Sequence, residues 1–252
     1  MNVRDEHVLR ELNLYPLWVR RGMPVQEEPV PAPLAIEVPE AIPEAKVEAA
    51  VAKAPPVAEI PDITSLPEVA SLDWAALKEK VRACDACQLR ATCTQTVFGV
   101  GDEQADWLFV GEGPGADEDA QGEPFVGQAG KLLDNMLFAI GLKRGDNVYI
   151  ANIVKCRPPN NRNPEHDEIA ACMPYLQQQI ALIKPRLIVA LGKVAATSLL
   201  GRDATLGSLR ETVHDYHGTP LIITYHPAYL LRSPAEKAKA WRDLKSAVEI
   251  MR

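Results

Sequence analysis

The sequence predicts an α/β sandwich built on a parallel sheet of about four strands. Four short apolar runs lead to this prediction: Trp107–Val110, Val148–Ile150, Leu187–Leu191 and Leu221–Tyr225. Gly, Pro, Asn or charged residues bound each run, as is typical of buried parallel strands. Helical patterns separate the runs, and strands that alternate with crossover helices form a parallel sheet. Ligands of such sheets bind beyond the carboxyl ends of the strands, so the residues after each run are candidates for a site.

Three helices in this pattern have recognisable ends. Between the first two runs, apolar residues recur at helical spacing from 132 to 140, and Gly141 stands where a C-terminal cap belongs. Asn163 and Pro164 offer an N-cap followed by proline at the first helical position, which predicts a helix through about Ile183. The stretch 233–236, Ser-Pro-Ala-Glu, has capping-box spacing and predicts the start of the last helix.

Length and composition limit the class of protein. A chain of 252 residues fits one sizeable domain with an appendage. No run approaches the roughly 18 apolar residues of a membrane helix, and residues 1–22 lack the apolar core of a secretory signal. Five cysteines, an odd number in a chain with no leader, predict a reducing, cytoplasmic location in which clustered thiols act as metal ligands. The lack of heptads predicts a monomer.

The composition divides the chain into three parts. Residues 1–22 form a short peptide with apolar residues that could line one side of a helix. This peptide is either a docking segment for a partner protein or a frayed tail. Residues 23–68 are rich in Pro, Ala and Glu, which predicts a disordered linker. Residues 69–252 hold the strand and helix patterns and are the predicted folded domain.

The charge follows the same division. The net charge is −7, but residues 23–68 hold nine acids against two lysines and account for the acidity. The predicted domain is nearly neutral. The composition therefore permits a polyanionic ligand such as DNA and does not by itself indicate one.

A glycine-rich loop follows the first strand. It reads Gly111-Glu112-Gly113-Pro114-Gly115 and could either form a structural turn or bring backbone amides close to an anion. It is neither a dinucleotide-binding fingerprint nor a P-loop. The acids that come next, residues 117–119, have the default interpretation of first-turn helix acids.

Three polar or aromatic residues follow at or between strand ends. Phe125 lies in a loop between glycines, where it is either a buried anchor or a stacking platform for a flat ligand. Asn152 ends the second strand and is either a turn residue or a reader of an amide-like ring edge. His226 follows the fourth strand and precedes Pro227, which favours a site over a structural histidine.

The cysteines have the spacing of metal ligands. Cys84 and Cys87 form a CxxC pair, and Cys156 and Cys172 lie sixteen residues apart across a Pro-rich loop. Four thiolates suit structural zinc or an iron–sulfur cluster. Cys93 is left over, either as a small buried residue or as a competing ligand.

Taken together, these segments resemble the family 4, iron–sulfur uracil-DNA glycosylases. The resemblance covers about the last 180 residues, with the segments in order. They are Cys84-x2-Cys87, Gly111-Glu112-Gly113-Pro114-Gly115, Glu123-Pro124-Phe125-Val126-Gly127, Asn152 to Arg162, Cys172, and His226-Pro227-Ala228 through Arg232. No single segment is specific, but the ordered set is.

The resemblance implies a three-layer α/β/α fold with a four-stranded parallel sheet. It also implies a structural [4Fe–4S] cluster on Cys84, Cys87, Cys156 and Cys172, since hydrolysis needs no electron transfer. The implied activity is a monofunctional hydrolase of N-glycosyl bonds that flips uracil out of DNA and leaves an abasic site, which initiates base-excision repair.

The resemblance also implies residue roles. Phe125 would stack on the flipped uracil, Asn152 would read O4 and N3–H, and Glu118 would crowd C5 and reject thymine. His226 would stabilise the negative charge that develops on O2.

The resemblance assigns the remaining roles to groups of residues rather than to single residues. Glu112, Gly113 and Asn161 would position the water or stabilise the sugar cation. Leu230 or Leu231 would be the wedge in the minor groove. The candidate phosphate contacts are Lys155, Arg157, Arg162 and Arg232.

Two other classes of function remain open at the level of sequence. One is a noncatalytic Fe–S module that binds DNA during replication, which would bind tightly and yield no abasic product. The other is a zinc-stabilised nucleotide hydrolase, which would be colourless and would bind through phosphate. The ordered set of Phe125, Asn152 and His226 favours the glycosylase, because each residue has a defined task on uracil.

Overall fold

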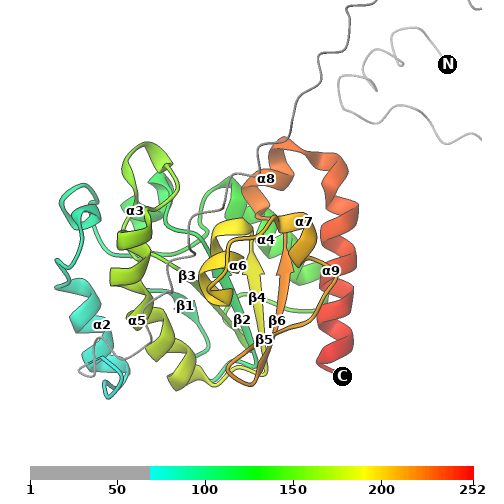
Figure 1. The fold of residues 1–252 in the computed structure, drawn as a ribbon, viewed down its shortest axis with the longest axis horizontal. Helices are drawn as coiled ribbons and strands as arrows, with labels where there is room; N and C mark the ends of the chain where they lie inside the picture. The colour runs from blue at the N-terminus through cyan, green and yellow to red at the C-terminus, as the bar shows by residue number, and fades with distance from the viewer. Residues whose placement is uncertain (1–68) are drawn as a thin grey trace, which may run out of the picture. The chain divides into compact units, whose positions relative to one another are not determined.

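The computed structural model describes residues 69–252, which form a sheet with helices against both faces (Figure 1). The six strands lie in the order β1-β3-β2-β4-β6-β5. Their bounds are β1 Val100–Gly101, β2 Trp107–Gly111, β3 Val148–Asn152, β4 Leu187–Leu191, β5 His214–Tyr216 and β6 Thr219–Thr224. The predicted peptide 1–22 and linker 23–68 lie outside the described residues.

Helices connect the strands and pack on the sheet. The α-helices are α2 Trp74–Arg82, α3 Ala116–Gln121, α4 Gln128–Ala139, α5 His166–Ile183, α6 Lys193–Leu200, α7 Leu206–Leu209, α8 Pro227–Arg232 and α9 Lys237–Ile250. Three 3-10 turns are η1 Gln88–Ala91, η2 Pro159–Asn161 and η3 Pro234–Glu236. No helix within residues 69–252 is long and apolar enough to cross a membrane.

The predicted α/β class is confirmed, and the strand count is wrong. The four predicted runs form the parallel core β3-β2-β4-β6. Two further strands, β1 and β5, pair antiparallel at the edges. They escaped prediction because they are only two and three residues long and partly exposed, so they carry no apolar run.

The predicted helix ends are partly correct. Gly141 follows α4 with φ +78°, as a helix-ending glycine does. The predicted start of α5 at Asn163–Pro164 is wrong by two residues, since the helix begins at His166 with Glu165 as its N-cap. The Glu165 N–H donates to the Glu168 carboxylate at 2.7 Å, which stabilises this start. Ser233 precedes the 3-10 turn η3 rather than opening α9 directly.

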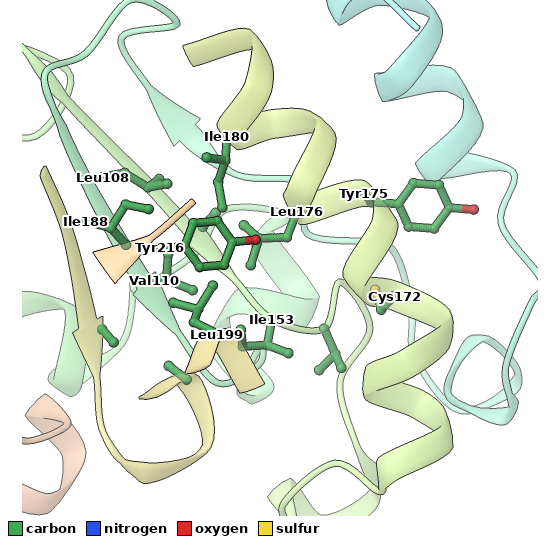
Figure 2. Close-up of a cluster of buried hydrophobic side chains, with 14 of the residues drawn as sticks. Leu108, Val110, Ile153, Cys172, Tyr175, Leu176, Ile180, Ile188, Leu199 and Tyr216 are labelled. Atoms are coloured by element: carbon green, nitrogen blue, oxygen red, sulfur yellow. The ribbon is translucent and has the colours of Figure 1, made fainter. Parts of the chain in front are cut away.

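The sheet has an apolar core on each face, which is what a three-layer sandwich requires. On β2, Leu108 and Val110 point to one face, while Trp107 and Phe109 point to the other. Figure 2 shows the first face, where Leu176 of α5 packs toward the sheet among fully buried residues. Each fully buried side chain of this size contributes about 1.5–3 kcal/mol. These layers hold the carboxyl ends of the four parallel strands together at one edge.

Candidate active site

The first strand ends meet at Gly111 and Asn152. They are register partners at the last positions of β2 and β3. A side chain at Gly111 would collide with the Asn152 Oδ1 atom, and would also come within 2.5 Å of the Phe125 ring. The missing side chain of Gly111 therefore leaves the space in which an amide and an aromatic ring approach each other.

His226 joins the same group of residues. It follows β6 directly, and its ring centroid lies 5.5 Å from that of Phe125, with the planes inclined by 32°. Gly192, after β4, allows this placement, since a Cβ there would lie 3.0 Å from the Cβ of His226. The structure thus brings together Phe125, Asn152 and His226 at the carboxyl edge of the sheet.

Asn152 carries an unpartnered polar atom. The residue is only 2% exposed, and its Oδ1 is buried without a hydrogen-bond partner in the described structure. Leaving such an acceptor unsatisfied costs about 1–3 kcal/mol. An orphaned acceptor beside an aromatic ring indicates a binding position for a flat ligand with an N–H group.

His226 is held as a neutral imidazole. Its Nδ1 accepts a hydrogen bond from the Ala228 N–H at 3.1 Å, which assigns the ring proton to Nε2. Burial lowers its pKa to about 4, and Arg232 acts in the same direction, while Glu118 opposes them. The imidazole therefore offers an uncharged N–H donor at neutral pH.

The loop that presents Phe125 is clamped in a strained conformation. Phe125 has φ +56°, a left-handed value that an aromatic residue rarely adopts. Arg144 holds the loop by donating to the Pro124 and Phe125 carbonyl oxygens at 2.8 and 2.7 Å. Gly130 of α4 permits the close approach, since a Cβ there would overlap the Phe125 carbonyl.

Glu118 ties the two glycine-rich loops together. Its Oε1 accepts from the Val126 and Gly127 N–H groups at 2.9 and 3.1 Å, and its Oε2 accepts from the Gly115 N–H at 3.1 Å. The carboxylate thus caps α3 and positions the Phe125 loop. A first-turn helix acid was the default interpretation of this residue, and its place in α3 agrees with it.

The three residues predicted to act on the water or sugar differ in burial and in contacts. Glu112 is half-buried, and burial raises the pKa of its carboxyl. Gly113 packs against Val154, 2.8 Å from the position of its absent Cβ. Asn161 is exposed in η2, and its Oδ1 accepts from Arg157 at 2.7 Å.

The four predicted ligand cysteines gather at a second place. Cys84, Cys87, Cys156 and Cys172 all line one pocket. Burial raises the pKa of the Cys172 thiol to about 11 and that of the Cys156 thiol further, with Cys93 adding to the latter through a hydrogen bond. Among residues 69–252, no three His, Cys, Asp or Glu side chains stand close enough to hold a single metal ion.

Two of the residues predicted to contact DNA are buried rather than exposed, which corrects the prediction for them. Lys155 is only 1% exposed, because its ammonium is enclosed between β3 and α5. Leu230 is 1% exposed, whereas Leu231 is 43% exposed, so only Leu231 of this pair is accessible for the predicted role of wedge. A stretch of sequence does not reveal which of two adjacent helical leucines faces inward.

The three arginines predicted to contact phosphate differ in exposure and in existing ion pairs. Arg232 is exposed at the end of α8 and Arg157 is partly exposed. Arg162 instead forms a two-pronged ion pair with the buried Glu168, at 2.6 and 2.8 Å. It holds the start of α5, which makes it a poorer phosphate contact than the other two.

Sequence reasoning missed several residues that build the site. Arg144 and Gly130 carry no motif, and their role follows only from their contacts with the Phe125 loop. Arg210 and Asp243 form a buried ion pair at 2.7 Å, and Asp243 also accepts from the Thr224 hydroxyl at 2.7 Å, two residues before His226. The burial of Arg210, after α7, and of Asp243, in α9, cannot be inferred from the local sequence, because it depends on their contact with each other.

Comparison with known proteins agrees with this geometry. The model of the uracil DNA glycosylase superfamily matches residues 98–245. A type-4 uracil-DNA glycosylase of Pyrobaculum aerophilum is 45% identical over 183 residues, which are 69% of this chain and 92% of that protein. Those of Archaeoglobus fulgidus and Thermotoga maritima are 42% and 44% identical over 68% and 65% of this chain, and 89% and 85% of their own lengths. The chain belongs to the uracil-DNA glycosylase superfamily, and within it to the type-4 group.

Proposed function

We propose that this protein hydrolyses the N-glycosidic bond of uracil in DNA and leaves an abasic site. The names of its type-4 relatives support this activity. The observation on which the proposal depends most is the buried, unpartnered Oδ1 of Asn152, which lies beside Phe125 and within the same group as His226. A base must leave the duplex to reach such an enclosed position, at a cost of a few kcal/mol in unstacking.

Asn152 would select uracil by hydrogen-bond pattern. Its Oδ1 would accept from uracil N3–H, and its amide would donate to O4. Cytosine presents a donor where uracil has O4 and an acceptor where uracil has N3–H, so both groups would lose their partners. Stacking on Phe125 would recover about 1–3 kcal/mol of the flipping cost. The hydrogen bonds that Glu118 accepts from the Phe125 loop would hold this stacking surface in place. From the same position, the Glu118 carboxylate would crowd C5 and exclude thymine.

His226 would stabilise the leaving group. Cleavage of the glycosidic bond moves negative charge onto uracil O2, and the neutral Nε2–H would donate to it. One preorganised donor of this kind is worth about 2.7–4 kcal/mol. The low pKa keeps the ring uncharged before reaction, so the donor is ready over the whole neutral range.

Glu112 would complete the hydrolysis. Its half-buried carboxylate, directly after β2, would orient a water or stabilise the positive charge that develops on the sugar. The Val154 N–H donates to the Glu112 carbonyl at 3.1 Å, which fixes the loop against the segment that follows Asn152. Gly113 keeps this loop close to Val154, and Asn161 would act from the surface side.

The cysteine pocket would hold a structural [4Fe–4S] cluster through Cys84, Cys87, Cys156 and Cys172. The fit is supported by the chemistry of the donors, because four cysteines line one pocket and cysteine thiolates are the ligands of such clusters. The cluster would supply a rigid link among η1, α5 and the segment after β3.

Cleavage of a labelled oligonucleotide with one uracil, followed by alkali and with EDTA present, tests the function. We expect a strand break at uracil and none where thymine or cytosine replaces it. Binding without a break would replace the glycosylase by a noncatalytic DNA-binding module. A break that appears only without EDTA would indicate catalysis by a removable metal ion.

A further inference from the structure

Lys155 is a buried lysine that joins two sites. Its Nζ donates to the Asn152 carbonyl oxygen at 2.8 Å and to the Gln179 Oε1 at 2.7 Å. Lys155 is 1% exposed and Gln179 is fully buried. The ammonium therefore holds the main chain of the residue whose amide would read the base.

The backbone of the same residue reaches the cysteine pocket. The Lys155 N–H donates to the Cys172 Sγ at 3.2 Å, and the Lys155 carbonyl accepts from the Val97 N–H at 2.7 Å. Cys172 and Gln179 lie seven residues apart on α5, about two turns, so one face of that helix contacts both ends of Lys155. Lys155 also lines the pocket together with Cys84, Cys87, Cys156 and Cys172.

The charge of Lys155 lacks a carboxylate partner. Within the described part of the chain, its hydrogen-bond acceptors are a carbonyl and an amide oxygen, and it takes part in none of the ion pairs. A buried ammonium with neutral acceptors alone is costly. The Cys172 sulfur, which accepts from the Lys155 N–H, would supply compensating negative charge as a cluster ligand.

We propose that Lys155 is a positioning residue that couples the cysteine cluster to Asn152. Its charge balances the thiolates, and its ammonium holds the Asn152 backbone in register with Gly111. The inference rests on the proposed roles of the four cysteines and of Asn152. Lys155 is not a catalytic residue, since its ammonium is buried and bonds to the Asn152 carbonyl oxygen and the Gln179 side chain. Damage to the cluster would reach base recognition through this residue, whose main chain contacts Cys172 and whose side chain contacts Asn152.

The test compares full-length Lys155→Met with Lys245→Met, the same change at an exposed position of α9. Three quantities are measured: iron and sulfide per chain, the reduction potential of the cluster, and affinity for an oligonucleotide with a non-cleavable 2′-fluorodeoxyuridine. We expect Lys155→Met to weaken uracil-analogue binding by about 10–100-fold, the usual effect of losing a supporting group around a metal ligand. Its potential should become more negative, because a positive charge near the cluster is lost. Lys245→Met should match the wild type in all three.

A second variant keeps the test decisive if Lys155→Met does not fold. Lys155→Gln retains a donor without the charge, so it should recover analogue binding more than it recovers the potential. Unchanged potential and unchanged analogue binding in a folded variant would overturn the inference. If Asn152→Ala in the wild-type background also kept full analogue affinity, or if the wild type held no iron, the proposed role of Asn152 or of the cysteines would fail. Loss of the glycosylase function itself would appear separately, as no cleavage of uracil DNA by the wild type.

Discussion

Gly111 and Asn152 end two adjacent parallel strands in register, and the missing side chain of the first leaves room for the amide of the second. The ring of Phe125 fills the remaining side of this space. A single methyl group at residue 111 therefore has a defined consequence. It would meet the side-chain oxygen of Asn152 and the aromatic ring at once.

Gly111→Ala should abolish most activity while the protein still folds. Overpacking of a tight position costs about 1–3 kcal/mol, and here the displaced groups are those that would hold the base. We expect kcat/KM on uracil DNA to fall by at least about 100-fold, mainly through loss of productive base binding. Gly207→Ala in α7 is the matched control, because nothing lies within 4 Å of a Cβ at that position. Equal activity in the two variants would show that the space beside Asn152 is not used.

Asn152→Ala should lose rate and uracil selectivity without losing stability. The substitution removes a buried acceptor that is unpartnered in the described structure, so thermal unfolding should occur at the same or a higher temperature. Cleavage assays with uracil, cytosine and thymine substrates give the selectivity, and calorimetry gives the stability. A marked drop in melting temperature would mean that the amide serves the fold rather than the base.

His226 makes stability depend on pH in a predictable direction. Its pKa is about 4 in the folded protein and about 6.5 when unfolded, so between these values the unfolded chain binds a proton that the folded chain does not. The free energy of unfolding should fall by about 2–3 kcal/mol as pH decreases from 6.5 to 4, and should not change through this group above 6.5. His226→Gln should lack this component. Urea unfolding of both proteins across this range measures the difference, and parallel pH curves would contradict the assignment.

The buried pair Arg210–Asp243 should be important for stability. Arg210 donates to both carboxylate oxygens, at 2.8 and 2.7 Å, and its guanidinium lies 4.4 Å from the Tyr225 ring centroid. Arg210→Met would leave Asp243 charged and buried, which costs about 3–5 kcal/mol. The double variant Arg210→Met/Asp243→Leu should recover much of this loss. Denaturant unfolding of the single and double variants checks the coupling, and additive losses would contradict it.

If Cys156 is a ligand of the proposed cluster, its substitution should remove the colour of the protein and lower its stability together. Cys156→Ala should lose the brown cluster absorbance, the bound iron and thermal stability together, since its thiol lines the pocket. Cys93→Ala should keep all three, because the residues that line the pocket include the other four cysteines and not Cys93. Iron content, absorbance and melting temperature are read on each purified protein. A brown, stable Cys156→Ala protein would make Cys93 the fourth ligand.

The sequence by itself determined the parallel core and the gathering of the base-site residues. Buried parallel strands need continuous apolar runs, so all four were visible, and parallel strands necessarily bring their carboxyl ends to one edge. Asn152 and His226 could therefore be placed together from position alone. The cysteine set was likewise visible from spacing.

Only the tertiary structure decided which side chains are enclosed and by what. Lys155 reads as an ordinary surface cation until Gln179 and Cys172, from a helix later in the chain, close around it. Leu230 and Leu231 are equivalent in sequence, and their exposure depends on how α8 packs against the rest of the fold. The clamp of Arg144 on the Phe125 loop joins residues with no shared pattern. Burial is a property of contacts between distant segments, and local sequence periodicity does not report it.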